Sequence, residues 1–253
     1  MTDYILLGVA ALLAGLIDAV VGGGGLIQVP ALFSALPNTT PATLLGTNKL
    51  ASVWGTAAAA HGYAKRFRVH WGAAVPAALS AFVLSFAGAY TVTHVSGDFF
   101  RKLLPLILLA VAIYTFRKKD FGKTHAPVHS GGAEKLVAVM IGGAIGFYDG
   151  FFGPGTGSFL VFLFVRFFGF DFLGASAVSK IVNVACNSSA LLWFGYSGHL
   201  LWQLGLLMAI CNVTGSLIGI RLAVKYGSGF VRILFLFVVT ALIIKTGWDA
   251  FLK

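Results

Sequence analysis

The sequence predicts an all-α polytopic membrane protein made of two homologous, inverted repeats, and three observations lead to this fold class. The first is composition: 58% of the residues are hydrophobic, 10% are charged and the mean hydropathy is +0.90, whereas soluble domains carry about 45–50% apolar and about 25% charged residues. The second is an internal duplication of the sequence. The third is the distribution of basic residues, which changes sides between the two halves.

The duplication is seen when the sequence is shifted by 131 positions. Identical residues then coincide without a gap along both halves, and they include two aspartates and two lysines inside otherwise apolar stretches. Equivalent pairs include Gly15 and Gly146, Asp18 and Asp149, Gly22 and Gly153, Gly24 and Gly155, Lys49 and Lys180, Trp71 and Trp202, Ser85 and Ser216, and Gly88 and Gly219. Charged side chains are costly inside a membrane, so we expect the aspartates and lysines to pair or to serve function.

Each half is expected to contain five helical segments, because apolar stretches alternate with glycines, prolines and charged residues. The expected segments are 4–21, 25–36, 41–62, 71–96 and 99–117, then 134–152, 156–168, 172–194, 201–225 and 229–249. A helix needs about 20 apolar residues to cross roughly 30 Å of hydrocarbon, and the second segment of each half is shorter. We therefore expect broken or re-entrant helices, with about eight to ten crossings in the bundle.

The basic residues predict how the two halves lie in the membrane. In the first half they gather in two loops, which carry Lys65, Arg66 and Arg68, and Arg117, Lys118, Lys119 and Lys123. Short loops rich in lysine and arginine lie on the cytoplasmic side. In the second half the loop at 195–201 has neither residue type, and the next connection carries Arg221, Lys225 and Arg232. The opposite bias predicts that residues 1–120 and 134–253 are inverted membrane repeats, joined by a cytoplasmic linker at 121–133, as in many secondary transporters.

Glycines interrupt the helix between the first and second segments of each half. The first half has four consecutive glycines at 22–25, and the second has Gly-Pro-Gly-Thr-Gly at 153–157. Such runs are unfavourable inside a helix, and they leave main-chain N–H groups and the positive end of the next helix dipole facing the break, which suits an anion. The expected donors are Gly23, Gly24, Gly25, Gly155, Thr156 and Gly157. Alternatively, the glycines only allow close helix packing.

A polar stripe follows the lysine in the third segment of each half. Asn183 and Asn187 lie three and seven residues after Lys180, on the same helix face, and Ser52 and Thr56 hold the equivalent positions after Lys49. A lysine ammonium binds an oxyanion, and side-chain amides donate further hydrogen bonds. The predicted substrate-binding side chains are Lys49, Lys180, Asn48, Asn183 and Asn187. Ser179 stands where the first half has Asn48, so the two half-sites are expected to bind a ligand unequally.

Asp18 and Asp149 lie just before the breaks. In a purely structural interpretation the lysines pair with these aspartates, or extend to the membrane surface. Pairing is compatible with anion binding, because an aspartate that gains a proton releases its lysine. Asp18 and Asp149 are therefore the predicted proton-coupling residues.

At these positions the sequence resembles a known family. The strings GLIDAVVGGGGLI at 15–27, GTNKL at 46–50 and GFYDGFFGPGTG at 146–157 are similar to those of the TauE/SafE family of membrane permeases, the sulfite exporter or toluene sulfonate uptake family, and notably of its YfcA-like members. The resemblance covers nearly the whole chain. It implies a multi-pass carrier of the bacterial inner membrane that exports small sulfur-containing anions such as sulfite or organosulfonates. We expect no cofactor, no metal and no nucleic-acid partner, and a monomer or homodimer in the lipid bilayer.

Other functions fit the sequence less well. An anion channel needs a continuous polar pore, whereas polar residues here are confined to the breaks and the lysine stripes; a carrier of another small organic anion stays open. An intramembrane aspartyl protease would share the Tyr148-Asp149 pair, but such proteases need Gly-x-Gly-Asp on the partner helix, and Asp18 follows Gly-Leu-Ile. The chain is therefore not expected to be an enzyme.

Overall fold

The computed structural model describes residues 2–96 and 131–251, and within these ranges the chain forms eight α-helices and no β-strand. The all-α fold class predicted from the sequence is confirmed. The fifth segment expected at 99–117 and most of the linker expected at 121–133 lie outside the described residues.

The helices begin and end close to the predicted limits. In chain order they are α1 (Thr2–Val21), α2 (Gly25–Ala35), α3 (Pro41–Ala64), α4 (Trp71–Thr93), α6 (Gly131–Phe151), α7 (Thr156–Phe168), α8 (Phe172–Tyr196) and α9 (Trp202–Phe251). Two differences stand out. α6 begins at Gly131 rather than at 134, and α9 spans two expected segments, which meet at Gly227, where φ of 68° and ψ of −169° are not helical.

Helices α3 and α8 begin with equivalent side-chain caps. The Thr40 hydroxyl accepts a hydrogen bond from the N–H of Thr43 at 3.4 Å. Asp171, the repeat counterpart of Thr40, accepts one from the N–H of Gly174 at 3.4 Å. Each cap satisfies a main-chain N–H that has no partner within its helix. The duplicated sequence therefore starts both helices in the same way.

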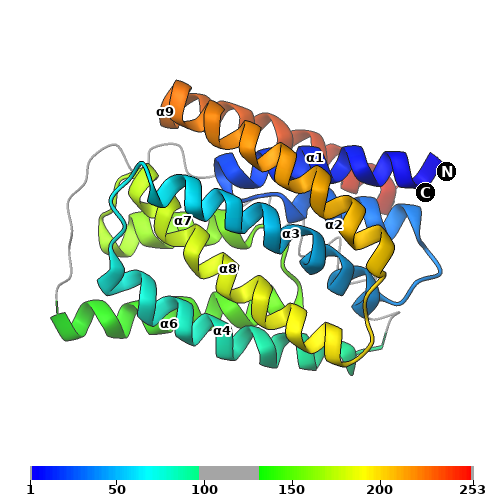
Figure 1. The fold of residues 1–253 in the computed structure, drawn as a ribbon, viewed down its shortest axis with the longest axis horizontal. Coiled ribbons are helices and arrows are strands. Elements are labelled where there is room, and N and C mark those ends of the chain that lie inside the picture. The colour runs from blue at the N-terminus through cyan, green and yellow to red at the C-terminus, as the bar shows by residue number, and fades with distance from the viewer. Residues whose placement is uncertain (1, 97–130, 252–253) are drawn as a thin grey trace.

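The two halves are interlocked rather than placed side by side. α1 of the first half packs along α9 of the second, and α6 of the second half packs along α4 of the first. α3 and α8 contact each other and cross between these two outer pairs (Figure 1). Because α6 and α9 are the repeat counterparts of α1 and α4, the outer pairs are one interaction made twice.

Glycines bring the paired helices into main-chain contact. A Cβ on Gly15 of α1 would collide with the main-chain oxygen of Asn212 in α9, and a Cβ on Gly146 of α6 would collide with the main chain of Ala81 in α4. The two contacts are equivalent, because Gly15 and Gly146 are 131 positions apart, and so are Ala81 and Asn212. Membrane helices gain van der Waals contact in this way, since lipid is as apolar as the side chains themselves.

Two equivalent serines tie the outer helices to the central ones. The hydroxyl of Ser85 in α4 donates to the main-chain oxygen of Cys186 in α8 at 2.9 Å. The hydroxyl of Ser216 in α9 donates to the main-chain oxygen of Gly55 in α3 at 2.6 Å. An approximate two-fold axis therefore relates the described parts of the halves. The direction of each half in the membrane and the domain limits stay predictions.

The outer helices carry the surface that faces lipid. Among the described residues, α1, α4 and the first part of α9 are long and apolar enough to cross a membrane. Leu79 of α4 and Ile210 of α9 are 65% and 69% exposed. Trp71 and Trp202, which begin α4 and α9, are each 58% exposed, as expected of aromatic anchors at a membrane surface.

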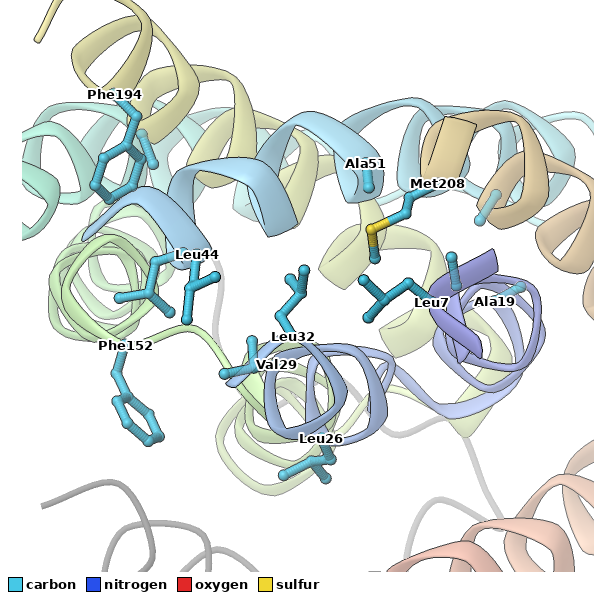
Figure 2. Close-up of a cluster of buried hydrophobic side chains, with 14 of the residues drawn as sticks. Leu7, Ala19, Leu26, Val29, Leu32, Leu44, Ala51, Phe152, Phe194 and Met208 are labelled. Carbon is cyan, nitrogen blue, oxygen red and sulfur yellow. The ribbon is translucent and has the colours of Figure 1, made fainter. Parts of the chain in front are cut away.

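An apolar cluster joins the two halves inside the bundle. Figure 2 shows Leu7 of α1, Leu32 of α2, Leu44 of α3 and Met208 of α9 within it, and all four side chains are buried. Contacts between the first three helices and α9 cross from one repeat to the other. The cluster therefore fixes α2 in the bundle although α2 is too short to cross the membrane.

We expect Gly15→Ala to lower the thermal midpoint of the protein purified in detergent. The added methyl group would push α1 away from α9, and overpacking of this kind costs about 1–3 kcal/mol. Gly8→Ala on the same helix is the control, since its Cβ would lie 3.5 Å from the Sγ of Cys211, an ordinary contact, and alanine favours helix formation over glycine. Equal midpoints for the two variants would show that α1 and α9 do not approach at Gly15.

Candidate functional site

The helix breaks predicted at the glycine runs are present in both halves, between α1 and α2 and between α6 and α7. The equivalent residues Gly22 and Gly153 have φ of 84° and 95°, in a left-handed region that glycine adopts without strain. α2 and α7 hold 11 and 13 residues, which span about 16 Å and about 20 Å at 1.5 Å per residue. Neither helix reaches across the hydrocarbon.

The two breaks lie against each other. The main-chain N–H of Ser158 donates to the main-chain oxygen of Gly22 at 3.0 Å, and the Ser158 hydroxyl donates to that of Val21 at 3.1 Å. A Cβ on Gly157 would lie 2.5 Å from the Cα of Gly22, so only glycine fits there. Close packing is therefore one role of Gly22 and Gly157, as the alternative interpretation of the glycine runs expects.

Two ion pairs cross between the halves. Nζ of Lys49 on α3 lies 2.5 Å from Oδ2 of Asp149 on α6, and both side chains are only 2% exposed. Nζ of Lys180 on α8 lies 3.0 Å from Oδ2 of Asp18 on α1, and it also donates to the main-chain oxygen of Asp18. Each lysine thus pairs with the aspartate of the other repeat. Neither half can neutralise its buried charges alone.

A polar cavity, partly open to the outside, lies between the breaks and the lysine-bearing helices. The lining residues that the sequence predicts as site residues are Asp18, Gly24, Gly25, Asn48, Lys49, Asp149, Gly155, Thr156, Gly157, Asn183 and Asn187. The others are Gly22, Ser52, Thr56, Gly153 and Asn212. Residues that lie far apart in the sequence, on both repeats, therefore meet around one cavity.

Two predicted site residues, Gly23 and Lys180, are not among the described lining residues. The main-chain oxygen of Gly23 accepts the N–H of Leu26 at 3.0 Å, so it serves the first turn of α2. The ammonium of Lys180 donates to the main-chain oxygen and to Oδ2 of Asp18. The repeat comparison shows which positions are equivalent, but it does not determine the direction in which a side chain points.

A pair of amides that the repeat comparison misses joins the site. Gln28 of α2 is fully buried; its Nε2 donates to the main-chain oxygen of Asn48 at 3.5 Å, and its Oε1 accepts from Nδ2 of Asn212 at 3.0 Å. Their repeat counterparts are Phe159 and Ala81, so no equivalence draws attention to them. The usable signal is a lone amide in an apolar segment, which must find a polar partner inside a membrane.

Two equivalent positions carry buried polar atoms that lack a partner. Oδ1 of Asn48 and Oγ of Ser179 make no hydrogen bond with the described residues. Buried polar atoms are nearly always paired, so such an atom points to water or a ligand. Asn48 lines the cavity. The cavity therefore offers an ammonium, the unpaired amide oxygen of Asn48 and two helix N-termini to a small polar molecule.

Comparison with known proteins identifies the family. The family model described as "Sulfite exporter TauE/SafE" matches residues 7–246. The chain belongs to the TauE/SafE family. A "Probable membrane transporter protein ORF9" of Sinorhizobium sp. is 38% identical over 237 residues, which cover 94% of this chain and 89% of that protein. The "Probable membrane transporter protein YfcA" of Escherichia coli (strain K12) is 34% identical over 253 residues, or 99% of this chain and 93% of that protein.

A "Probable membrane transporter protein" of Haemophilus influenzae is 30% identical over 242 residues, which cover 94% of this chain and 93% of that protein. No solved structure is significantly similar to the chain. With its apolar helices, this TauE/SafE protein is a multi-pass membrane transporter of the bacterial inner membrane, not an enzyme. Its surroundings are the lipid bilayer and its cargo is a small molecule.

The crossed pairing predicts which double variants restore stability. Lys49→Gln leaves Asp149 as an unpaired buried charge, which costs about 3–5 kcal/mol, and Asp149→Asn should recover most of the lost thermal midpoint in detergent. Asp18→Asn combined with Lys49→Gln is the matched control, because it disturbs the other pair and should lower the midpoint further. Rescue by Asp18→Asn instead would mean that the pairs form within each repeat.

Proposed function

We propose that this TauE/SafE protein exports small sulfur-containing anions, sulfite or organosulfonates, and that the anion binds in the cavity between the two breaks and moves together with a proton. One observation carries the proposal: the cavity combines a buried lysine, side-chain amides and the N-termini of two short helices. The family description names sulfite and export, and it supports both choices.

The donors around the cavity suit an oxyanion. Several N–H groups in the first turns of α2 and α7 bond to the breaks, as Leu26 does to Gly23 and Thr156 to Gly153, but the helix dipole places a partial positive charge at each N-terminus. Lys49 provides a full positive charge and several N–H groups, and Asn48 and Asn212 provide amides. A sulfite or sulfonate group presents several oxygens around one sulfur, so donors from different directions can bind it at once.

Charge balance supports the proton. The two lysines and two aspartates of the crossed pairs cancel, so an anion that enters alone leaves one buried charge without compensation. Protonation of Asp149 restores neutrality and releases Lys49 to the anion. Besides Lys49, the titratable groups close to Asp149 include Cys186 of α8. Asp149 pairs with Lys49, the lysine that lines the cavity, so the proposed proton exchange takes place at Asp149.

The interlocked repeats offer a route for alternating access. Inverted repeats allow a carrier to open to one side and then to the other when one half rocks against its partner. The crossed pairs and the touching breaks lie where the halves meet, so a bound anion changes the contacts on which such rocking depends. Binding and movement would thus be coupled at one place.

We expect selected anions to stabilise the purified protein against heat. The panel contains sulfite, thiosulfate, sulfoacetate, taurine, sulfate, chloride and acetate, and a site filled at 100 times its dissociation constant adds about 2.7 kcal/mol. Stabilisation by sulfite or sulfonates, absent with chloride and acetate and lost in Lys49→Ala, supports the proposal. A well-folded protein that no sulfur oxyanion stabilises would contradict the proposal. Stabilisation by acetate alone would indicate that the cargo is a carboxylate.

A further inference from the structure

The repeats are equivalent, but the two sides of the cavity are not. We propose that the anion binds on one side only, to Lys49, Asn48 and Asn212, and that Lys180 is a positioning residue that holds the first helix break. This inference rests on the proposed function, because it divides roles among residues of the same site.

The two lysines differ in what their ammonium groups contact. Lys49 lines the cavity, and among the described residues its partner is the single carboxylate oxygen of Asp149. An ammonium has three N–H donors, so Lys49 keeps donors for a ligand. Lys180 instead binds both the carboxylate and the main-chain oxygen of Asp18. Lys180 therefore has two partner oxygens within the described residues, where Lys49 has one.

The bond from Lys180 to the main chain explains its positioning role. The main-chain oxygen of Asp18 also accepts the N–H of Gly22 at 2.8 Å, at the point where α1 ends. Lys180 therefore binds the last turn of α1, next to Gly22, whose backbone is in the left-handed region. The second break is built differently, since the N–H of Gly153 donates to the oxygen of Tyr148 at 3.2 Å.

The neighbours of the two lysines differ as well. Asn48 lines the cavity and its Oδ1 has no partner in the described part of the chain, whereas its counterpart Ser179 is not among the described lining residues. Asn212 lines the cavity and is oriented by Gln28. The counterpart of Asn212 is Ala81, which offers no side-chain hydrogen bond. At these two positions the side of Lys49 has an amide where the side of Lys180 has a serine or an alanine.

Three other polar side chains of the cavity donate hydrogen bonds within the protein. Thr56 donates to Oδ2 of Asp18 at 3.2 Å, and Thr156 donates to the main-chain oxygen of Gly153 at 2.7 Å. Asn187 donates to Oδ1 of Asn183 at 3.3 Å. These three side chains therefore have partners within the protein.

The test compares two charge-neutral double variants of the full chain in detergent. Lys49→Gln with Asp149→Asn removes the proposed binding pair, and Lys180→Gln with Asp18→Asn removes its counterpart. The affinities for sulfite and methanesulfonate are measured by titration calorimetry. We expect the first variant to lose affinity by about 100-fold, as for a lost bond to a charged group. The second should stay within about threefold of the wild type.

Transport in proteoliposomes separates positioning from binding. The Lys180→Gln/Asp18→Asn protein should keep the KM of the wild type while its turnover falls by at least about tenfold, because the break no longer holds its shape during the cycle. A raised KM with unchanged turnover would overturn the positioning role. Turnover is expressed per anion-binding site counted by calorimetry, because a loss of folded protein would otherwise lower turnover at an unchanged KM.

Single variants keep the test independent of the ion pairs. Asn48→Ala and Asn212→Ala should each weaken anion binding by about tenfold, and the matched control Ser179→Ala should leave it unchanged. Equal losses in both double variants, or a loss in Ser179→Ala as large as in Asn48→Ala, would overturn the one-sided site while the proposed function stands. A wild-type protein that binds neither anion would overturn the proposed function, and the one-sided site with it.

Discussion

Two buried lysine–aspartate pairs, each joining one repeat to the other, constrain the rest of the structure. A lone charge in hydrocarbon is costly, and removing one partner of a buried pair costs about 3–5 kcal/mol. An apolar pair of similar volume is often as stable or more so. Stability therefore does not explain why Lys49–Asp149 and Lys180–Asp18 are ionic. The proposed exchange of a carboxylate for an anion in the cavity would explain it.

The crossing of these pairs dictates how the chain is arranged. Lys49 on α3 reaches Asp149 on α6 only if the two halves come together at the break of the second half, so the halves must interlock. Interlocking brings α1 against α9 and α4 against α6, and glycines such as Gly15 and Gly146 make room for the main chains. The breaks then meet at the same place as the charges, which produces a polar cavity inside an apolar bundle.

Much of this arrangement could be predicted from the sequence. Composition and the spacing of 131 residues predict the all-α membrane bundle, and the glycine runs predict both helix breaks. The identity of residues across repeats also marks the aspartates and lysines. It could not show that the pairs cross between repeats, because a duplication states which residues are equivalent and not which are neighbours. The repeat comparison also detects only residues that are alike in both halves. It therefore missed Gln28 and Asn212, whose counterparts are apolar.

The central claim is that Lys49 exchanges a carboxylate for an anion when Asp149 gains a proton, and the pH dependence of anion affinity tests it most directly. Methanesulfonate is a suitable probe because its charge does not change near neutral pH. In the wild type, affinity should fall as pH rises, by about tenfold per pH unit where Asp149 loses its proton, whereas Asp149→Asn should bind equally at every pH. A wild-type affinity that does not change with pH would contradict the exchange.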